Sequence, residues 1–215
     1  MCGIAGLIHK GKTVNIGKEL RDMLQALKHR GPDSTGYALY GEGSNGDYIM
    51  RFKVGENVGE GSSAVNEDKS VYDSRKKQVD SHLKELGAQI VKEDRLTPYS
   101  FRYIIKYDKD LMEFSKKIES VEMTEILSLG KSLELVKDLG DANTVSKQYG
   151  LDKMKGTHAI GHSRMATESG VDIRSAHPFW GYPFSDMSVV HNGQLTSYWN
   201  NRRDLERKGM RFMSE

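Results

Sequence analysis

The second residue of the chain is a cysteine, and it is the only cysteine among the 215 residues. Aminopeptidases remove an initiator methionine when the next residue is small, and this would leave Cys2 with a free α-amine. The pKa of an α-amine is about 8 and that of a thiol about 8.5, so the amine can accept the thiol proton close to neutral pH. Although a lone cysteine is usually a small buried hydrophobe, its place at position two predicts a nucleophile that carries its own base.

Arg164 and the Asn192-Gly193 pair have the chemistry of substrate-binding residues. The guanidinium of Arg164 can donate two parallel hydrogen bonds to a carboxylate, and Thr167 can add a hydroxyl to the same anion. The side-chain amide of Asn192 and the backbone N–H of Gly193 can donate to an oxygen that develops negative charge. Taken alone, Arg164 also fits a surface ion pair and Asn192-Gly193 a plain turn.

Three histidines are candidates for a metal site or for a cysteine–histidine pair. His162, His177 and His191 lack the spacing of zinc ligands on a helix, and the chain has no second cysteine to complete such a site. We therefore expect them to support neighbouring residues, and we expect neither a metal nor another cofactor.

Apolar periodicity indicates the elements that position these residues. An apolar run at 3–8 predicts a buried strand directly after Cys2, and a helical pattern at 16–29 ends at Gly31 and the following proline. Arg30 and Gly31 either form a plain turn or hold the loop of Cys2, and the sequence leaves both open. Further strands are predicted at 36–40, 99–107, 157–163 and 187–191, and helices at 71–86, 108–118, 123–139 and 196–208. Strands segregated from helices in this way predict an α+β fold.

The bulk properties restrict the partners of the chain. Hydrophobic residues make up 37% and charged residues 29%, and the formal charge is only +2, so we expect no nucleic acid as a ligand. No apolar run is long enough to cross a bilayer, and the first residues lack the features of a signal peptide, so we expect no membrane association. One cysteine excludes an intramolecular disulfide and favours a cytoplasmic location.

Five short motifs carry a resemblance to a known family. They are MCGIAG at 1–6, RGPDSTG at 30–36, GHSRMAT at 161–167, SAHPF at 175–179 and VHNG at 190–193. In this order they resemble the conserved blocks of class II glutamine amidotransferases, which are N-terminal nucleophile hydrolases. The long segment between the second and third motifs, and the wording of the motifs, most resemble the glutaminase component associated with glutamate synthases.

The resemblance implies a fold, a reaction and a set of roles. The expected fold is a four-layer αββα sandwich, in which residues 1–215 form the N-terminal part of the amidotransferase domain and carry a family-atypical α/β insert at about 55–155. The expected reaction is attack of Cys2 on the side-chain amide of L-glutamine, which gives a γ-glutamyl thioester and releases ammonia for a synthase domain or subunit. The implied roles are catalytic for Cys2, Asn192 and Gly193, substrate-binding for Arg164, Thr167 and Gly193, and supporting for Arg30, Gly31 and His191.

The chain also departs from the family pattern. Met165 occupies a position that is often aromatic, and the aspartate that binds the α-ammonium group in the family is expected beyond Phe212 but is not reached before Glu215. We therefore expect a chain truncated at its C-terminus, active only after Met1 is removed. Two alternatives stay open: an amidase of the same superfamily that acts on another amide, and a non-catalytic regulatory or assembly module with the same fold.

Overall fold

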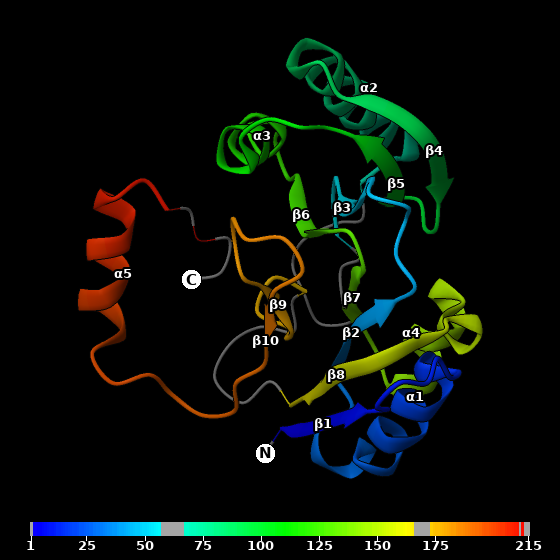
Figure 1. The fold of residues 1–215 in the computed structure, drawn as a ribbon. Helices are drawn as coiled ribbons and strands as arrows, with labels where there is room; N and C mark the ends of the chain where they lie inside the picture. The colour runs from blue at the N-terminus through cyan, green and yellow to red at the C-terminus, as the bar shows by residue number, and fades with distance from the viewer. Residues whose placement is uncertain (1, 57–66, 166–172, 211, 213–215) are drawn as a thin grey trace.

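The protein is built on two four-stranded sheets, both antiparallel (Figure 1). The computed structural model describes residues 2–56, 67–165, 173–210 and 212. The first sheet has the strand order β1-β8-β2-β7. Its strands are β1 (Gly3–Ile8), β8 (Gly156–Arg164), β2 (Ser34–Gly41) and β7 (Leu133–Leu139). The predicted strands at 3–8, 36–40 and 157–163 are thus confirmed, and so is the α+β class.

Two helices cover one face of the first sheet. They are α1 (Ile16–Ala26) and α4 (Ala142–Tyr149), and α1 ends in a short 3-10 turn, η1 (Lys28–Arg30). Leu20 and Leu24 of α1 are fully buried with Tyr37 of β2 and Val136 of β7. The helix predicted at 16–29 is therefore confirmed, with its last turn tightened into η1, whereas α4 was not predicted.

The opposite face of the first sheet carries a short hairpin. Its strands, β9 (Phe179–Trp180) and β10 (Ser188–Val189), pair antiparallel, and only the second falls within the strand predicted at 187–191. Trp180 packs against buried Ala38, Leu133 and Leu135 of the sheet. This hairpin lies between two of the sequence motifs, 175–179 and 190–193, so its contacts matter for the candidate site.

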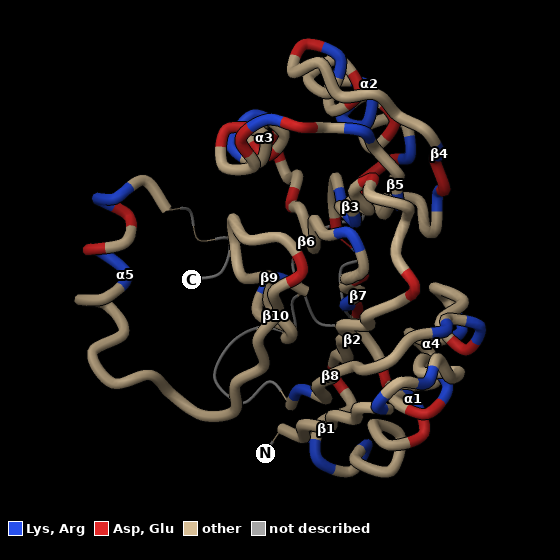
Figure 2. Tube along the Cα trace, viewed as in Figure 1, with Lys and Arg blue, Asp and Glu red and all other residues tan. Residues whose placement is uncertain are grey.

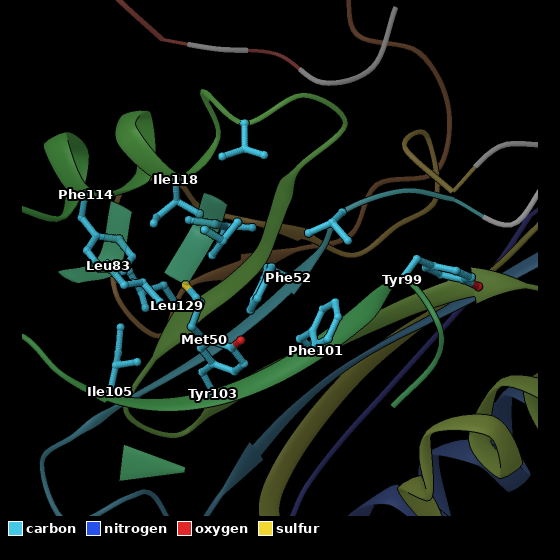
Figure 3. Close-up of a cluster of buried hydrophobic side chains, with 14 of the residues drawn as sticks. Met50, Phe52, Leu83, Tyr99, Phe101, Tyr103, Ile105, Phe114, Ile118 and Leu129 are labelled. Carbon is cyan, nitrogen blue, oxygen red and sulfur yellow. The ribbon is translucent and has the colours of Figure 1, made fainter. Parts of the chain in front are cut away.

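The second sheet and its two helices form a βαββαβ unit, the ferredoxin-like arrangement. The sheet order is β4-β5-β3-β6. The elements follow the chain as β3 (Tyr48–Lys53), α2 (Lys69–Leu86), β4 (Gln89–Arg95), β5 (Ser100–Lys106), α3 (Leu111–Ile118) and β6 (Glu125–Gly130). One face is apolar, and Figure 3 shows Phe52, Phe101 and Tyr103 of this face with Leu83 and Phe114 of the helices. The predicted elements at 71–86, 99–107 and 108–118 are confirmed.

The other face of the second sheet is charged and meets β7. Arg51 and Arg102 lie directly opposite each other on β3 and β5, and like charges in this position repel. The carboxylate of Glu134 on β7 lies between them, accepting from Arg51 Nε at 2.8 Å and from Arg102 Nε at 2.7 Å. Burial raises the pKa of Glu134, but the charges of the two arginines outweigh it and hold the pKa at about 2.

The helix predicted at 123–139 is wrong. The segment forms β6 and β7, joined by a turn at Lys131-Ser132. Every residue of β6 is buried, and so are six of the seven residues of β7. A strand that is covered on both faces has an apolar pattern without alternation, and this cannot be distinguished from a buried helix by periodicity.

The last described helix, α5 (Tyr198–Arg207), stands apart from both sheets in Figure 1 and has no fully buried residue. It confirms the helix predicted at 196–208. Basic and acidic residues are interspersed along it and along α2 (Figure 2). Beyond residue 210, only Phe212 lies within the described residues. Among the described helices, none has the length and apolar content needed to cross a membrane.

The ionic contact between the sheets can be tested by removing its carboxylate. Replacing Glu134 with Gln removes the carboxylate between Arg51 and Arg102, and leaves Arg102 with only its longer contact to Asp94, at 3.4 Å. We expect the free energy of unfolding to fall by about 3 kcal/mol, because a buried pair loses one partner. Chemical denaturation at neutral pH measures this. Glu42→Gln, at an exposed position, is the control and should change stability by less than about 0.5 kcal/mol. Equal effects of the two variants would contradict the assigned role of Glu134.

Candidate active site

The register of the first sheet brings Cys2 beside Arg164. Gly3 of β1 pairs with Ser163 of β8, so the preceding and following residues, Cys2 and Arg164, are neighbours at the same end of the sheet. The Cys2 thiol points to the backbone carbonyl of Met165, with Sγ 3.9 Å from the oxygen. Arg164 is 8% exposed and pairs with Ser34 of the neighbouring strand β2. Two motifs that are 160 residues apart in the sequence thus meet at one strand end.

Gly31 lies against the backbone of the same strand end. A Cβ at this position would be 2.5 Å from the carbonyl carbon of Arg164 and 2.7 Å from the carbonyl oxygen of Ser163. The backbone N–H of Asp33 donates to the carbonyl of Arg164 at 3.1 Å. Arg30, half-buried, ends the 3-10 turn just before. The structure therefore joins these residues to the end of β8 that carries Arg164, and a side chain larger than hydrogen at Gly31 would displace it.

Asn192 contacts the residue that contains the candidate nucleophile. Its side-chain Nδ2 donates to the carbonyl oxygen of Cys2 at 3.0 Å. The next residue, Gly193, has a φ of 120°, a backbone conformation that side chains rarely tolerate. The neighbouring His191 donates its backbone N–H to Nδ1 of His177 at 3.0 Å. The fourth and fifth sequence motifs are therefore joined to each other and to Cys2.

Three histidine rings lie in a row next to the contact between Asn192 and Cys2. The ring of His162 on β8 is 4.9 Å from that of His177, which is 6.5 Å from that of His191. Burial lowers the pKa of His162 to about 4, with further contributions from His177 and Arg164. Burial likewise lowers the pKa of His177 to about 4, helped by the charge of Lys137. Both rings are therefore neutral at pH 7, and His177, whose Nδ1 accepts a hydrogen bond, carries its proton on Nε2.

Gly36 permits the close approach of the second motif to the fourth. A Cβ on Gly36 of β2 would be only 2.0 Å from the carbonyl oxygen of His177 and 2.8 Å from Pro178. His162 is paired with Gly36 on the neighbouring strand, and the ring of His177 packs against that of His162. The absence of a side chain at Gly36 is thus what lets residues 177–178 lie on the sheet.

Similar proteins indicate what this arrangement belongs to. A protein of Methanothermobacter thermautotrophicus that bears the name glutamine amidotransferase is 38% identical over 224 residues, covering 99% of this chain and 67% of the relative. The chain belongs to the class II glutamine amidotransferases. The glutamine amidotransferase-like protein GlxB of Rhizobium meliloti is 31% identical over 220 residues, 100% of this chain and 66% of its own length. Amidophosphoribosyltransferase 2 of Arabidopsis thaliana is 36% identical over 87 residues, 40% of this chain and 16% of the relative.

No model of a protein family matches the sequence. The chain spans about two thirds of the length of the first two relatives, at 67% and 66%.

Not every predicted site residue lies within the described part of the chain. Thr167 lies outside the described residues, as does Met1. Ser34 was not predicted; its hydroxyl is buried beside Arg164 and has no hydrogen-bond partner among the described residues. Asp186, which is near the fifth motif in sequence, is engaged by backbone N–H groups of the β6–β7 turn. Its carboxylate is therefore not free to receive an α-ammonium group.

A cavity of about 650 Å³ lies elsewhere in the described part of the chain. Its walls come from β6, the β9–β10 hairpin and α5, and Lys137 and Glu125 form a charged corner with Nζ and Oε1 3.0 Å apart. Neither Cys2, Arg164 nor Asn192 is among its lining residues. Within the described part of the chain, no cluster of three or more His, Cys, Asp or Glu side chains could hold a metal ion.

The buried histidines predict a loss of stability in mild acid. An unfolded histidine takes up a proton near pH 6.5, whereas His162 does so near pH 4, so between these values the unfolded state binds more protons. The free energy of unfolding should therefore fall as pH is lowered, by roughly 2 kcal/mol per buried histidine between pH 7 and pH 5. His162→Phe should remove about half of this slope, because His177 retains its share. Denaturation at several pH values measures it, and an unchanged slope would contradict the argument.

Proposed function

We propose that the chain carries out the glutaminase half-reaction of a class II glutamine amidotransferase, with Cys2 as its nucleophile. The observation that carries the proposal is the meeting of Cys2, Arg164 and Asn192 at one end of the first sheet. A thiol, a guanidinium and an amide donor within one site are the groups needed to attack and hold the side-chain amide of an amino acid.

Removal of Met1 is the first step, because it frees the α-amine of Cys2. The amine takes the thiol proton, and the thiolate sulfur attacks the amide carbon of glutamine. The carbon–nitrogen bond then breaks, and ammonia leaves with the proton held by the α-ammonium group. Water, deprotonated by the same amine, cleaves the γ-glutamyl thioester to give glutamate and the free thiol.

Asn192 and Gly193 stabilise the charge that develops on the amide oxygen. The Asn192 amide already donates one N–H to the carbonyl of Cys2, which leaves its second N–H for the oxyanion. The second donor is the backbone N–H of Gly193, and its direction is set by the φ of 120° at this residue. Donors of this kind are each worth about 10²–10³ in rate. His191, through its bond to His177, supports them.

Arg164 binds the α-carboxylate of glutamine, with the hydroxyl of Thr167 as a further donor. Burial of the Arg164 side chain excludes water and strengthens a paired hydrogen bond to a carboxylate. Arg30 and Gly31 hold the strand end on which Arg164 lies.

The wider architecture belongs to the proposal as well. Ile4 and Ile8 of β1 are apolar, yet their side chains are 42% and 69% exposed. Apolar residues on an open sheet face are expected where a further layer packs, and this supports a four-layer αββα sandwich. In that fold the insert predicted at about 55–155 contains most of the βαββαβ unit, and the ammonia passes to a synthase domain or subunit. A glutamate synthase is the partner that the motifs favour.

Intact mass before and after treatment with the glutamine analogue diazo-oxo-norleucine tests the proposal. We expect the mass of the chain without Met1, then a single adduct on Cys2, together with glutamate release from glutamine. Cys2→Ser should give neither adduct nor release. A processed chain that reacts with other amides but not with glutamine would indicate an amidase. One that has lost Met1 and forms no adduct and releases no glutamate would indicate a non-catalytic module.

Arg164 offers a second prediction. Arg164→Lys keeps the charge but replaces two parallel hydrogen bonds with one, so KM for glutamine should rise about 10- to 100-fold. The turnover number should change little, because the α-carboxylate is bound equally in the ground and transition states. Steady-state kinetics on processed protein measure both. Arg203→Lys, on exposed α5, is the matched control. A fall in kcat at constant KM would contradict this role.

A further inference from the structure

The segment 177–193, here called the site hairpin, connects the candidate oxyanion residues to a distant turn. It contains β9 and β10, and its tip holds Asp186 at a φ of 57°, a left-handed conformation that is uncommon for aspartate. Within the site hairpin, Gly181 donates its N–H to the carbonyl of Met187 at 2.8 Å, and Trp180 Nε1 donates to the carbonyl of Phe184 at 2.8 Å. The tip is thus a closed, hydrogen-bonded turn.

The Asp186 carboxylate binds the turn between β6 and β7. Oδ2 accepts from the backbone N–H of Lys131 at 3.0 Å, and Oδ1 accepts from those of Ser132 and Leu133 at 2.7 and 2.8 Å. The hydroxyls of Ser132 and Ser185 donate to the same carboxylate at 3.0 and 2.7 Å. Three consecutive backbone donors therefore end on one side chain that comes from more than fifty residues away.

This contact is ionic at neutral pH and sterically tight. Burial raises the pKa of Asp186, but the backbone donors at Lys131, Ser132 and Leu133 lower it by more. The pKa is therefore about 2. A Cβ at Gly130, the last residue of β6, would lie 2.6 Å from Oδ1. The turn therefore fits the carboxylate closely, and a methyl group at Gly130 would push it away.

The other end of the site hairpin reaches the nucleophile. Ser188 Oγ lies 2.8 Å from the hydroxyl of Tyr40 on β2, and two residues separate Val189 from Asn192. Asn192 then donates to the carbonyl of Cys2. Asn192 itself is exposed, so its direction depends on the backbone that leads to it.

We propose that Asp186 is a positioning residue for Asn192 and Gly193, which fixes the site hairpin on the β6–β7 turn so that both oxyanion donors keep their direction. The inference rests on the proposed function, because it assigns Asn192 and Gly193 to the oxyanion. Arg164 lies on β8 and not on the site hairpin, so its contact with the α-carboxylate of glutamine is independent of Asp186. Loss of the Asp186 contact should accordingly lower kcat and leave KM nearly unchanged.

Asp186→Asn and Gly130→Ala test the inference from the two sides of the contact. Asn loses acceptor capacity for the three N–H donors, and the methyl group of Ala displaces the carboxylate while leaving Asp186 in place. We expect each to lower kcat for glutamine hydrolysis about 10- to 100-fold, since a shift of about 1 Å in a catalytic group has this effect. KM should stay within about 2-fold, and alkylation of Cys2 by iodoacetamide, which needs no oxyanion donor, should keep its wild-type rate.

Asp110→Asn is the matched control. Asp110 caps α3 by accepting the backbone N–H of Glu113 at 2.7 Å, so this variant also removes a carboxylate from a backbone N–H, but within the second sheet's helical layer. If the two Asp→Asn variants have the same kcat, or if kcat in Asp186→Asn falls only in proportion to folded protein, the positioning role is overturned. Should Asp186→Asn fail to fold, Gly130→Ala decides by the same criteria. A processed wild-type chain without glutaminase activity would overturn the proposed function, and this inference with it.

Discussion

The candidate site depends on the register of β1 against β8 and β2. Gly3 pairs with Ser163, and Ser163 pairs in turn with Thr35, so three motifs from separate parts of the chain reach the same end of one sheet. Because side chains alternate between the faces of a strand, a slip of one residue in β1 would turn Cys2 away from Arg164. Packing of the strand against the residue that follows α1 opposes that slip, since a Cβ on Gly3 would lie 3.0 Å from Leu27 Cβ.

Much of this arrangement could be predicted from the sequence because its signals are local. β1, β2 and β8 are apolar runs bounded by turn residues, and α1 has a clear apolar stripe, so their positions agree with the patterns. The failure at 123–139 has a physical cause: Ile126, Leu127, Leu133 and Leu135 are all buried, and a pattern without alternation carries no period. The roles predicted for Cys2, Arg164 and Asn192 stay predictions, although the fold brings these residues together.

Contacts that join distant segments could not be predicted from the sequence. Nothing near Asp186 in the sequence indicates that its carboxylate accepts from residues 131–133, because the donors are backbone groups of a turn that the pattern assigned to a helix. The pairing of Glu134 with Arg51 and Arg102 could not be predicted either, because the sequence pattern around each charged residue is that of a surface group. Burial converts such residues from solvated charges into specific contacts, and burial is a property of the whole fold.

β7 connects these contacts with the candidate site. It is a strand of the first sheet, yet Glu134 ties it to the charged face of the second sheet, and its first residue, Leu133, donates to Asp186. A displacement of the second sheet would therefore move the β6–β7 turn and, through the site hairpin, Asn192. Arg164 is separated from this route, because it lies on β8, across β2 from β7. Under the proposed function, a change in the βαββαβ unit should thus affect Asn192 more than it affects Arg164.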